Sequence, residues 1–110
     1  MFETNYDVVV IGAGPAGLAS AIEAKKVGAQ KVLLVERDSD LGGILQQCIH
    51  PGFGLHIFDQ ELTGPEYAYR FIEQIKPLGI DVLLNTMVLD IHSDDNRIYA
   101  ENQEKGICNI

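Results

Sequence analysis

The sequence predicts a three-layer α/β domain: a short parallel sheet with helices, to which an antiparallel β-meander is attached. Two observations support this prediction. Over residues 6–84, apolar runs rich in Val, Leu and Ile alternate with helical segments, which is typical of parallel strands joined by crossover helices. Residues 87–110 change to short strand-like runs separated by turn sequences, as expected for an antiparallel meander.

The composition is that of one small folded domain. The chain has 110 residues, of which 46% are hydrophobic and 22% charged, and these are ordinary globular proportions. Its formal net charge is -8, which argues against a nucleic-acid partner, because phosphate binding there needs Lys and Arg side chains. No apolar run reaches the roughly 18 to 20 residues of a membrane span, and no secretory signal begins the chain. We therefore predict a cytoplasmic protein without a membrane span.

Residues 6–36 form the first predicted unit, a βαβ unit of about 30 residues. Its strands are the apolar runs 6–11 and 31–36, which have the pattern of strands buried on both faces. Between them, residues 18–27 are rich in Ala, Leu and Ile and carry two lysines in the last turn, Lys25 and Lys26. Gly28 follows, and basic residues with a terminal glycine mark the end of a helix.

The remainder of the chain divides into three parts. Residues 37–62 form a glycine-containing loop without a sustained period, and loops of this length are usually functional. Residues 63–84 begin with Thr63 and Glu66 at capping-box spacing, which predicts a second helix and then a third parallel strand. Residues 87–110 form the three strands of the meander.

Residues 1–110 are therefore predicted to be the N-terminal part of a single domain. A doubly wound sheet needs more than three strands, so we expect a piece of a longer protein, inactive by itself. Its open sheet edge is expected to self-associate or to be covered by a partner chain.

The glycine-rich sequence GAGPAG joins the first predicted strand to the first helix. Gly12, Gly14 and Gly17 have the G-x-G-x-x-G spacing: the first permits a sharp turn, the second lets the backbone approach a pyrophosphate, and the third lets the helix pack on the strand. Pro15 and Ala16 lie within this motif, and the N-terminus of the helix that follows presents free N–H groups to the phosphates. This context predicts a Rossmann-type dinucleotide site; the alternative is a glycine-rich turn of an unrelated α/β protein.

Glu36 ends the second strand, about 20 residues beyond the motif. Its carboxylate can accept hydrogen bonds from ribose hydroxyls and would repel a 2′-phosphate, which disfavours NADP at this site. The alternative is a solvated carboxylate. If Glu36 lies at an open strand end, its replacement should change ligand binding and leave the fold stability nearly unchanged.

The GAGPAG motif, the pair Glu36-Arg37 and the pair Gly42-Gly43 together resemble the flavin domain of pyridine nucleotide-disulfide oxidoreductases and related two-dinucleotide flavoenzymes. The resemblance covers nearly the whole chain, including the meander after the third strand. It implies an oxidoreductase that transfers hydride between NAD(P)H, or a reduced small-molecule substrate, and FAD. The residues that it assigns to FAD are Gly12, Gly14, Pro15, Ala16, Gly17, Glu36, Arg37, Gly42 and Gly43.

One departure from that family lies in the loop after the glycine pair. Disulfide reductases carry two redox cysteines there, and Leu45 and His50 stand at those positions. The lone thiol of Cys48 could approach the flavin, although a small buried residue is the simpler interpretation. His50 and His56 could support acid–base chemistry, although loop packing is favoured. No cluster completes a metal-ligand set, so no metal site is predicted.

Two other functions stay open at this point. An NAD-dependent dehydrogenase would use the same glycines to hold NAD, and a purified yellow protein with flavin absorbance would exclude it. A non-catalytic cofactor-binding subunit of a dehydrogenase complex would share the same fold. Turnover of NADH by the full-length chain with an artificial electron acceptor would exclude that second alternative.

Overall fold

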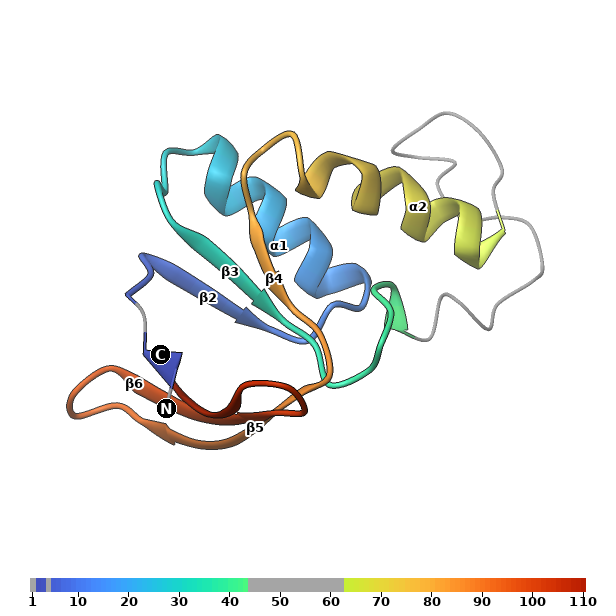
Figure 1. Ribbon diagram of the computed structural model, residues 1–110. Coiled ribbons are helices and arrows are strands. Elements are labelled where there is room, and N and C mark those ends of the chain that lie inside the picture. The colour runs from blue at the N-terminus through green and yellow to red at the C-terminus, as the bar shows by residue number, and fades with distance from the viewer. Residues whose placement is uncertain (1, 4, 44–62) are drawn as a thin grey trace.

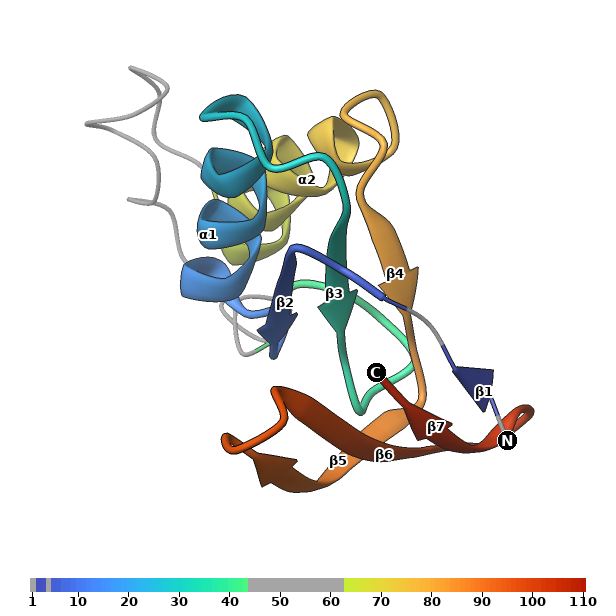
Figure 2. The same ribbon diagram turned by 90° about the vertical axis from the view of Figure 1, so that its left-hand side faces the viewer.

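The computed structural model describes residues 2–3, 5–43 and 63–110 (Figure 1). A pair of helices, a parallel sheet and a second sheet lie one on another as three layers (Figure 2). The predicted fold class, a partial Rossmann-type arrangement with an attached meander, is confirmed.

The middle layer is a parallel sheet of three strands. β2 (Val8–Ile11), β3 (Val32–Val35) and β4 (Asp81–Leu83) are hydrogen-bonded in the order β2-β3-β4. All pairs are parallel, as predicted for the βαβ unit and the strand after the second helix. β3 therefore lies in the centre of this sheet, and its apolar residues are buried along its whole length.

Each face of β3 contributes to a different core. Val32 and Leu34 pack toward the helices, whereas Leu33 and Val35 pack toward the meander, because successive side chains of a strand point to opposite faces. The helix-side core consists of Ala13, Leu18, Ala21, Ile22, Val32, Leu34, Phe71, Ile75 and Ile80, and the meander-side core of Leu33, Val35, Leu83, Ala100, Cys108 and Ile110. The unbroken apolar run thus reflects a strand covered by helices on one face and by the meander on the other.

Two helices cover the face of the parallel sheet to which Val32 and Leu34 point (Figure 1). α1 (Pro15–Lys26) begins three residues before the predicted start, with Pro15 in the first turn, where its missing N–H is not needed. α2 (Gly64–Ile75) is the second predicted helix, and it buries Ala68, Phe71 and Ile75. Neither helix of the described part is long and apolar enough to cross a membrane.

α2 begins with the predicted capping box. The N–H of Glu66 donates to Thr63 Oγ1 at 3.4 Å, and the N–H of Thr63 donates to Glu66 Oε1 at 3.0 Å. The backbone N–H of Thr63, and then its hydroxyl, lower the pKa of Glu66 from the ordinary value of 4.5. Because the folded pKa is lowered, the stabilisation from this carboxylate is present above pH 4.5 and is lost as the pH falls through the folded pKa.

The Thr63→Ala substitution is expected to lower the free energy of unfolding by about 1 kcal/mol, the usual effect of losing an N-cap hydroxyl. Urea unfolding of the full-length protein at neutral pH measures this change. Thr63→Ser, which keeps the hydroxyl, is the matched control. Equal stability of the two variants would show that the cap does not stabilise α2.

The third layer is a four-stranded sheet. β5 (Thr86–His92), β6 (Arg97–Asn102) and β7 (Gly106–Asn109) form the predicted antiparallel meander. β1 (Phe2–Glu3) adds a fourth strand parallel to β7, so the order is β1-β7-β6-β5. The sequence does not predict the strand β1, because two residues are too few to show a periodic pattern.

Candidate functional site

The glycine-rich sequence lies at the carboxyl end of β2, where the chain turns into α1 (Figure 1). Gly12 has a φ of +99°, which lies in the left-handed region that favours glycine. A Cβ added at Gly17 would lie 1.7 Å from the carbonyl oxygen of Gly12. α1 therefore passes the turn at a distance that only glycine permits, and the first and third glycines have the geometry that the motif predicts.

Gly14 caps the N-terminus of α1, and this end of the helix is open. Among the residues that the structure describes, no atom would lie within 4 Å of a Cβ built on Gly14 and no side chain caps the helix; the first turn of α1 contains no acidic residue. The N–H groups of Ala16 and Gly17 lie in this first turn, where the helix itself provides no acceptor. α2, in contrast, is capped by its own side chains. The open end of α1 has the donors, the positive dipole end and the space that a phosphate group requires.

The pair Gly42-Gly43 lies against the same turn. The N–H of Gly42 donates to the carbonyl oxygen of Ala13 at 2.7 Å. A Cβ at Gly43 would lie 3.0 Å from the Cα of Gly14, and Gly43 has a φ of +57°. Two glycine-rich segments that are distant in sequence thus form one cradle of backbone atoms.

Glu36 follows β3 directly, and only 6% of it is exposed. Its Oε1 accepts the N–H of Ala13 and its Oε2 accepts the N–H of Asp38, both at 2.8 Å. The side chain is therefore not at an open strand end, and the expectation that its replacement would spare the fold is wrong. Two backbone N–H groups would lose their acceptor.

A cavity of about 320 Å³ lies beside Glu36. Its lining residues come from three strands and the segments that follow them: Ile11, Gly12, Val35, Glu36, Arg37, Thr86, Met87 and Val88. An adjoining cavity of about 430 Å³ shares the exposed Arg37 and Met87. The sequence does not predict that β5 residues line this cavity, because a strand of the meander carries no cofactor-binding motif. Only the tertiary fold brings β5 beside Glu36.

Cys48, His50 and His56 lie outside the described residues, so their roles stay predictions. Within the described ranges, Cys108 is a buried free thiol, and no group of three or more His, Cys, Asp or Glu residues could hold a metal ion. His92 ends β5 on the surface, with Nε2 2.8 Å from Asp90 Oδ2.

Residues 7–76 match the family model of FAD dependent oxidoreductases. The thioredoxin reductase of Ureaplasma parvum is 39% identical over 84 residues, which are 76% of this chain and 26% of that protein. The soluble pyridine nucleotide transhydrogenase of Hahella chejuensis is 50% identical over 92 residues, 83% of this chain and 16% of that protein. A ferredoxin–NADP reductase of Paraburkholderia phymatum is 33% identical over 107 residues, 94% of this chain and 29% of that protein.

Solved structures show the same fold. The thioredoxin reductase of Lactococcus lactis matches with a TM-score of 0.71 and 25% identity, over 94% of this chain and 33% of that one. The L-proline dehydrogenase of P. horikoshii matches with a TM-score of 0.81 and 21% identity, over 99% of this chain and 21% of that one. The chain thus spans a third or less of the length of each of these proteins.

The matched residues include the whole glycine cradle and Glu36. The thioredoxin reductase and ferredoxin–NADP reductase relatives confirm the resemblance to the pyridine nucleotide-disulfide type of flavoenzyme. The sequence match and the fold agree, and this chain belongs to the FAD dependent oxidoreductases.

Proposed function

We propose that the glycine cradle binds the pyrophosphate of FAD and that the protein transfers hydride between NAD(P)H, or a reduced small-molecule substrate, and this flavin. The observation that carries the proposal is the uncapped N-terminus of α1 beside the open position of Gly14. The N–H groups of Ala16 and Gly17 would hold the phosphates. Backbone donors need no Lys or Arg, so the site is compatible with a net charge of -8.

The adenosine half of FAD would lie toward Glu36. A carboxylate offers about four lone-pair positions, and the two backbone N–H groups of Ala13 and Asp38 occupy two of them. The remaining two can accept the ribose hydroxyls. The cavity of about 320 Å³ lined by Arg37 and Met87 is the adjoining space for the adenine.

The residues described here bind and orient the cofactor, whose isoalloxazine supplies the hydride chemistry when bound. Gly42 and Gly43, which lie against the turn of Ala13 and Gly14, would let the backbone approach FAD closely. The names of the ferredoxin–NADP reductase and transhydrogenase relatives support NAD(P)H as the second reactant. A non-catalytic subunit remains the alternative, and NADH turnover by the full-length protein distinguishes the two.

The predicted self-association, or coverage by a partner chain, also stays part of this proposal. Large apolar side chains are exposed at the end of β2 (Ile11) and along β5 (Met87, Leu89 and Ile91), and clustered apolar surface favours association. The cytoplasmic location is proposed from the composition of the sequence. Size-exclusion chromatography of the full-length protein measures the oligomeric state.

Gly14→Val is expected to abolish FAD retention, because the added side chain would occupy the pyrophosphate position. The flavin absorbance of the purified full-length protein is compared with that of the variant. Circular dichroism of the flavin-free proteins is the control for folding, since Gly14 has space for a side chain and an ordinary φ of -74°. A folded Gly14→Val variant with wild-type flavin content would contradict the assignment.

A further inference from the structure

Four polar or charged residues are buried in the part of the chain that the structure describes, and three of them lie together: Glu36, Thr86 and Asn102. They surround the short turn of residues 84–85, which connects β4 to β5 at the carboxyl end of the parallel sheet. A buried polar side chain costs free energy unless it is fully hydrogen-bonded. Their partners therefore show what the group does.

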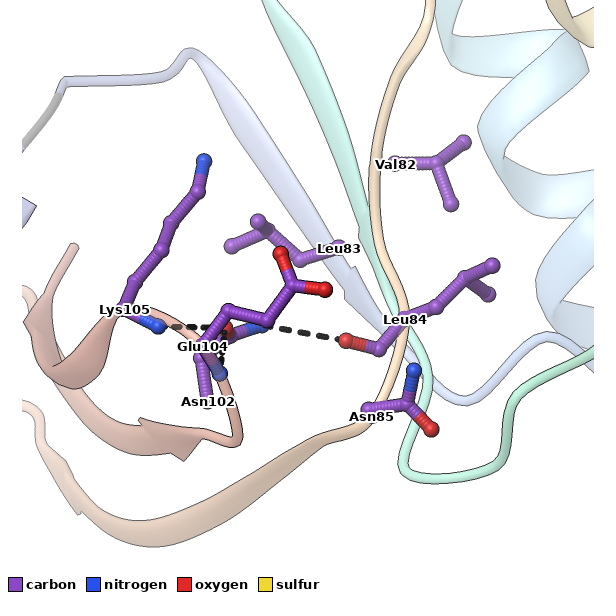
Figure 3. A pocket seen from close by; sticks show the side chains of 7 residues that line it. All are labelled: Val82, Leu83, Leu84, Asn85, Asn102, Glu104 and Lys105. Atoms are coloured by element: carbon purple, nitrogen blue, oxygen red, sulfur yellow. Dashed lines mark hydrogen bonds between the residues drawn. The ribbon is translucent and has the colours of Figure 1, made fainter.

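Asn102 joins two turns through its side-chain amide (Figure 3). Its Nδ2 donates to the carbonyl oxygen of Leu84 at 3.0 Å and to Thr86 Oγ1 at 2.7 Å. Its Oδ1 accepts the N–H groups of Glu104 and Lys105 at 2.9 and 2.8 Å. All the donors and acceptors of the amide are used, and the β6–β7 turn is thereby attached to the β4–β5 turn.

The β4–β5 turn also contacts the segment that carries Glu36. The N–H of Thr86 donates to the carbonyl oxygen of Glu36 at 3.0 Å, and the N–H of Asn85 donates to that of Asp38 at 2.9 Å. Asp38 in turn donates its N–H to Glu36 Oε2. The turn therefore fixes both the backbone of Glu36 and the amide that orients its carboxylate.

The backbone of Asn85 shows that the β4–β5 turn depends on the hydrogen bonds around it. It has a φ of +52°, a left-handed conformation that, after glycine, asparagine adopts most readily. Such a conformation persists where surrounding bonds determine it, and here the carbonyl of Asn85 also accepts the N–H of Gln103 at 3.2 Å. Loss of the Asn102 and Thr86 contacts would free the turn to relax.

We propose that Thr86 and Asn102 are positioning residues of the FAD site. They fix the turn that holds the Glu36 carboxylate against Ala13 of the glycine loop, with two lone-pair positions directed to the ribose. This inference rests on the proposed FAD site. A carboxylate that is held in advance binds a ligand more tightly, because less conformational freedom is lost on binding.

The test is the pair Thr86→Val and Thr86→Ser in the flavin-free full-length protein. Valine keeps the branched shape of Thr86 and removes the hydroxyl, whereas serine keeps it. We expect Thr86→Val to weaken binding of both FAD and ADP by about tenfold, the effect of losing one or two hydrogen bonds, and Thr86→Ser to restore most of the affinity. Fluorescence titration with FAD and calorimetry with ADP measure these changes.

Amide hydrogen exchange supplies a readout that a general loss of stability would not give. Exchange at Ala13 and Asp38 should accelerate in Thr86→Val and not in Thr86→Ser, relative to reference amides of Phe71 and Ile75 in α2. Glu104→Ala removes an exposed side chain and keeps the backbone N–H that Asn102 accepts; it is the matched control and should behave as wild type.

Asn102→Asp is the second variant, used also if Thr86→Val does not fold. The carboxylate keeps an acceptor for the N–H groups of Glu104 and Lys105 but removes both donors, so the same tenfold loss is expected. Wild-type affinity for FAD and ADP, or unchanged exchange at Ala13 and Asp38, would overturn the positioning role. Failure of the FAD site itself would show separately, as normal flavin content in folded Gly14→Val.

Discussion

The Gly17→Ala substitution is expected to lower the free energy of unfolding by about 3 kcal/mol or more, at the upper end of the cost of overpacking. The added methyl group would lie 1.7 Å from the carbonyl oxygen of Gly12 and 2.9 Å from its carbonyl carbon. Both atoms belong to the backbone, so no side-chain rotation can relieve the contact. α1 would have to move away from β2, which would open the core that contains Leu18.

Gly14→Ala is the matched control for this prediction. No atom of the described residues lies within 4 Å of a Cβ added at Gly14, so the stability of the flavin-free protein should fall by about 1 kcal/mol or less, the cost of alanine at an N-cap. Urea unfolding of flavin-free full-length proteins is the required measurement, because bound FAD would itself raise the apparent stability. Equal stability of the two variants would show that α1 does not approach the turn as described.

Glu36→Ala is expected to lower both fold stability and FAD affinity. The buried N–H of Ala13 and the partly buried N–H of Asp38 would lose their acceptor, and the buried unsatisfied group alone costs roughly 1 to 3 kcal/mol. FAD would lose the contact between its ribose and Glu36, and the glycine loop would no longer be held by the bond from Ala13 to Glu36. The dissociation constant of FAD should therefore rise by about tenfold or more. Urea unfolding of the flavin-free protein and fluorescence titration with FAD measure the two effects separately.

Glu36→Gln separates the two roles of this side chain. The amide keeps one oxygen acceptor and places an NH₂ group opposite the other backbone N–H, so stability should lie between that of wild type and that of Glu36→Ala. If Glu36→Ala leaves the free energy of unfolding unchanged, Glu36 does not stabilise the glycine loop through Ala13. If it leaves FAD affinity unchanged in a destabilised protein, Glu36 is purely structural and the ribose contact is wrong.

Local signals in the sequence were sufficient for most of the secondary structure. The apolar run at β3 predicted a strand buried on both faces, and the capping box of Thr63 and Glu66 predicted the start of α2. The glycine spacing predicted the turn between β2 and α1. These features depend on neighbours within a few residues, which is why the sequence alone determines them. The two-residue strand β1 has no such signal, since its pairing with β7 spans the whole chain.

The sequence by itself determined the fold class, the glycine turn and the flavoenzyme family, and through the family the cofactor FAD. Only the tertiary structure decided how the parts of the site meet. It placed Gly43 against Gly14, buried Glu36 between two backbone amides, and connected Asn102 to that carboxylate through a turn. The physical reason is that these contacts join segments distant in sequence. The contacts of Asn102 depend in addition on the packing of the meander against the carboxyl end of the parallel sheet, and no local pattern of residues specifies that packing.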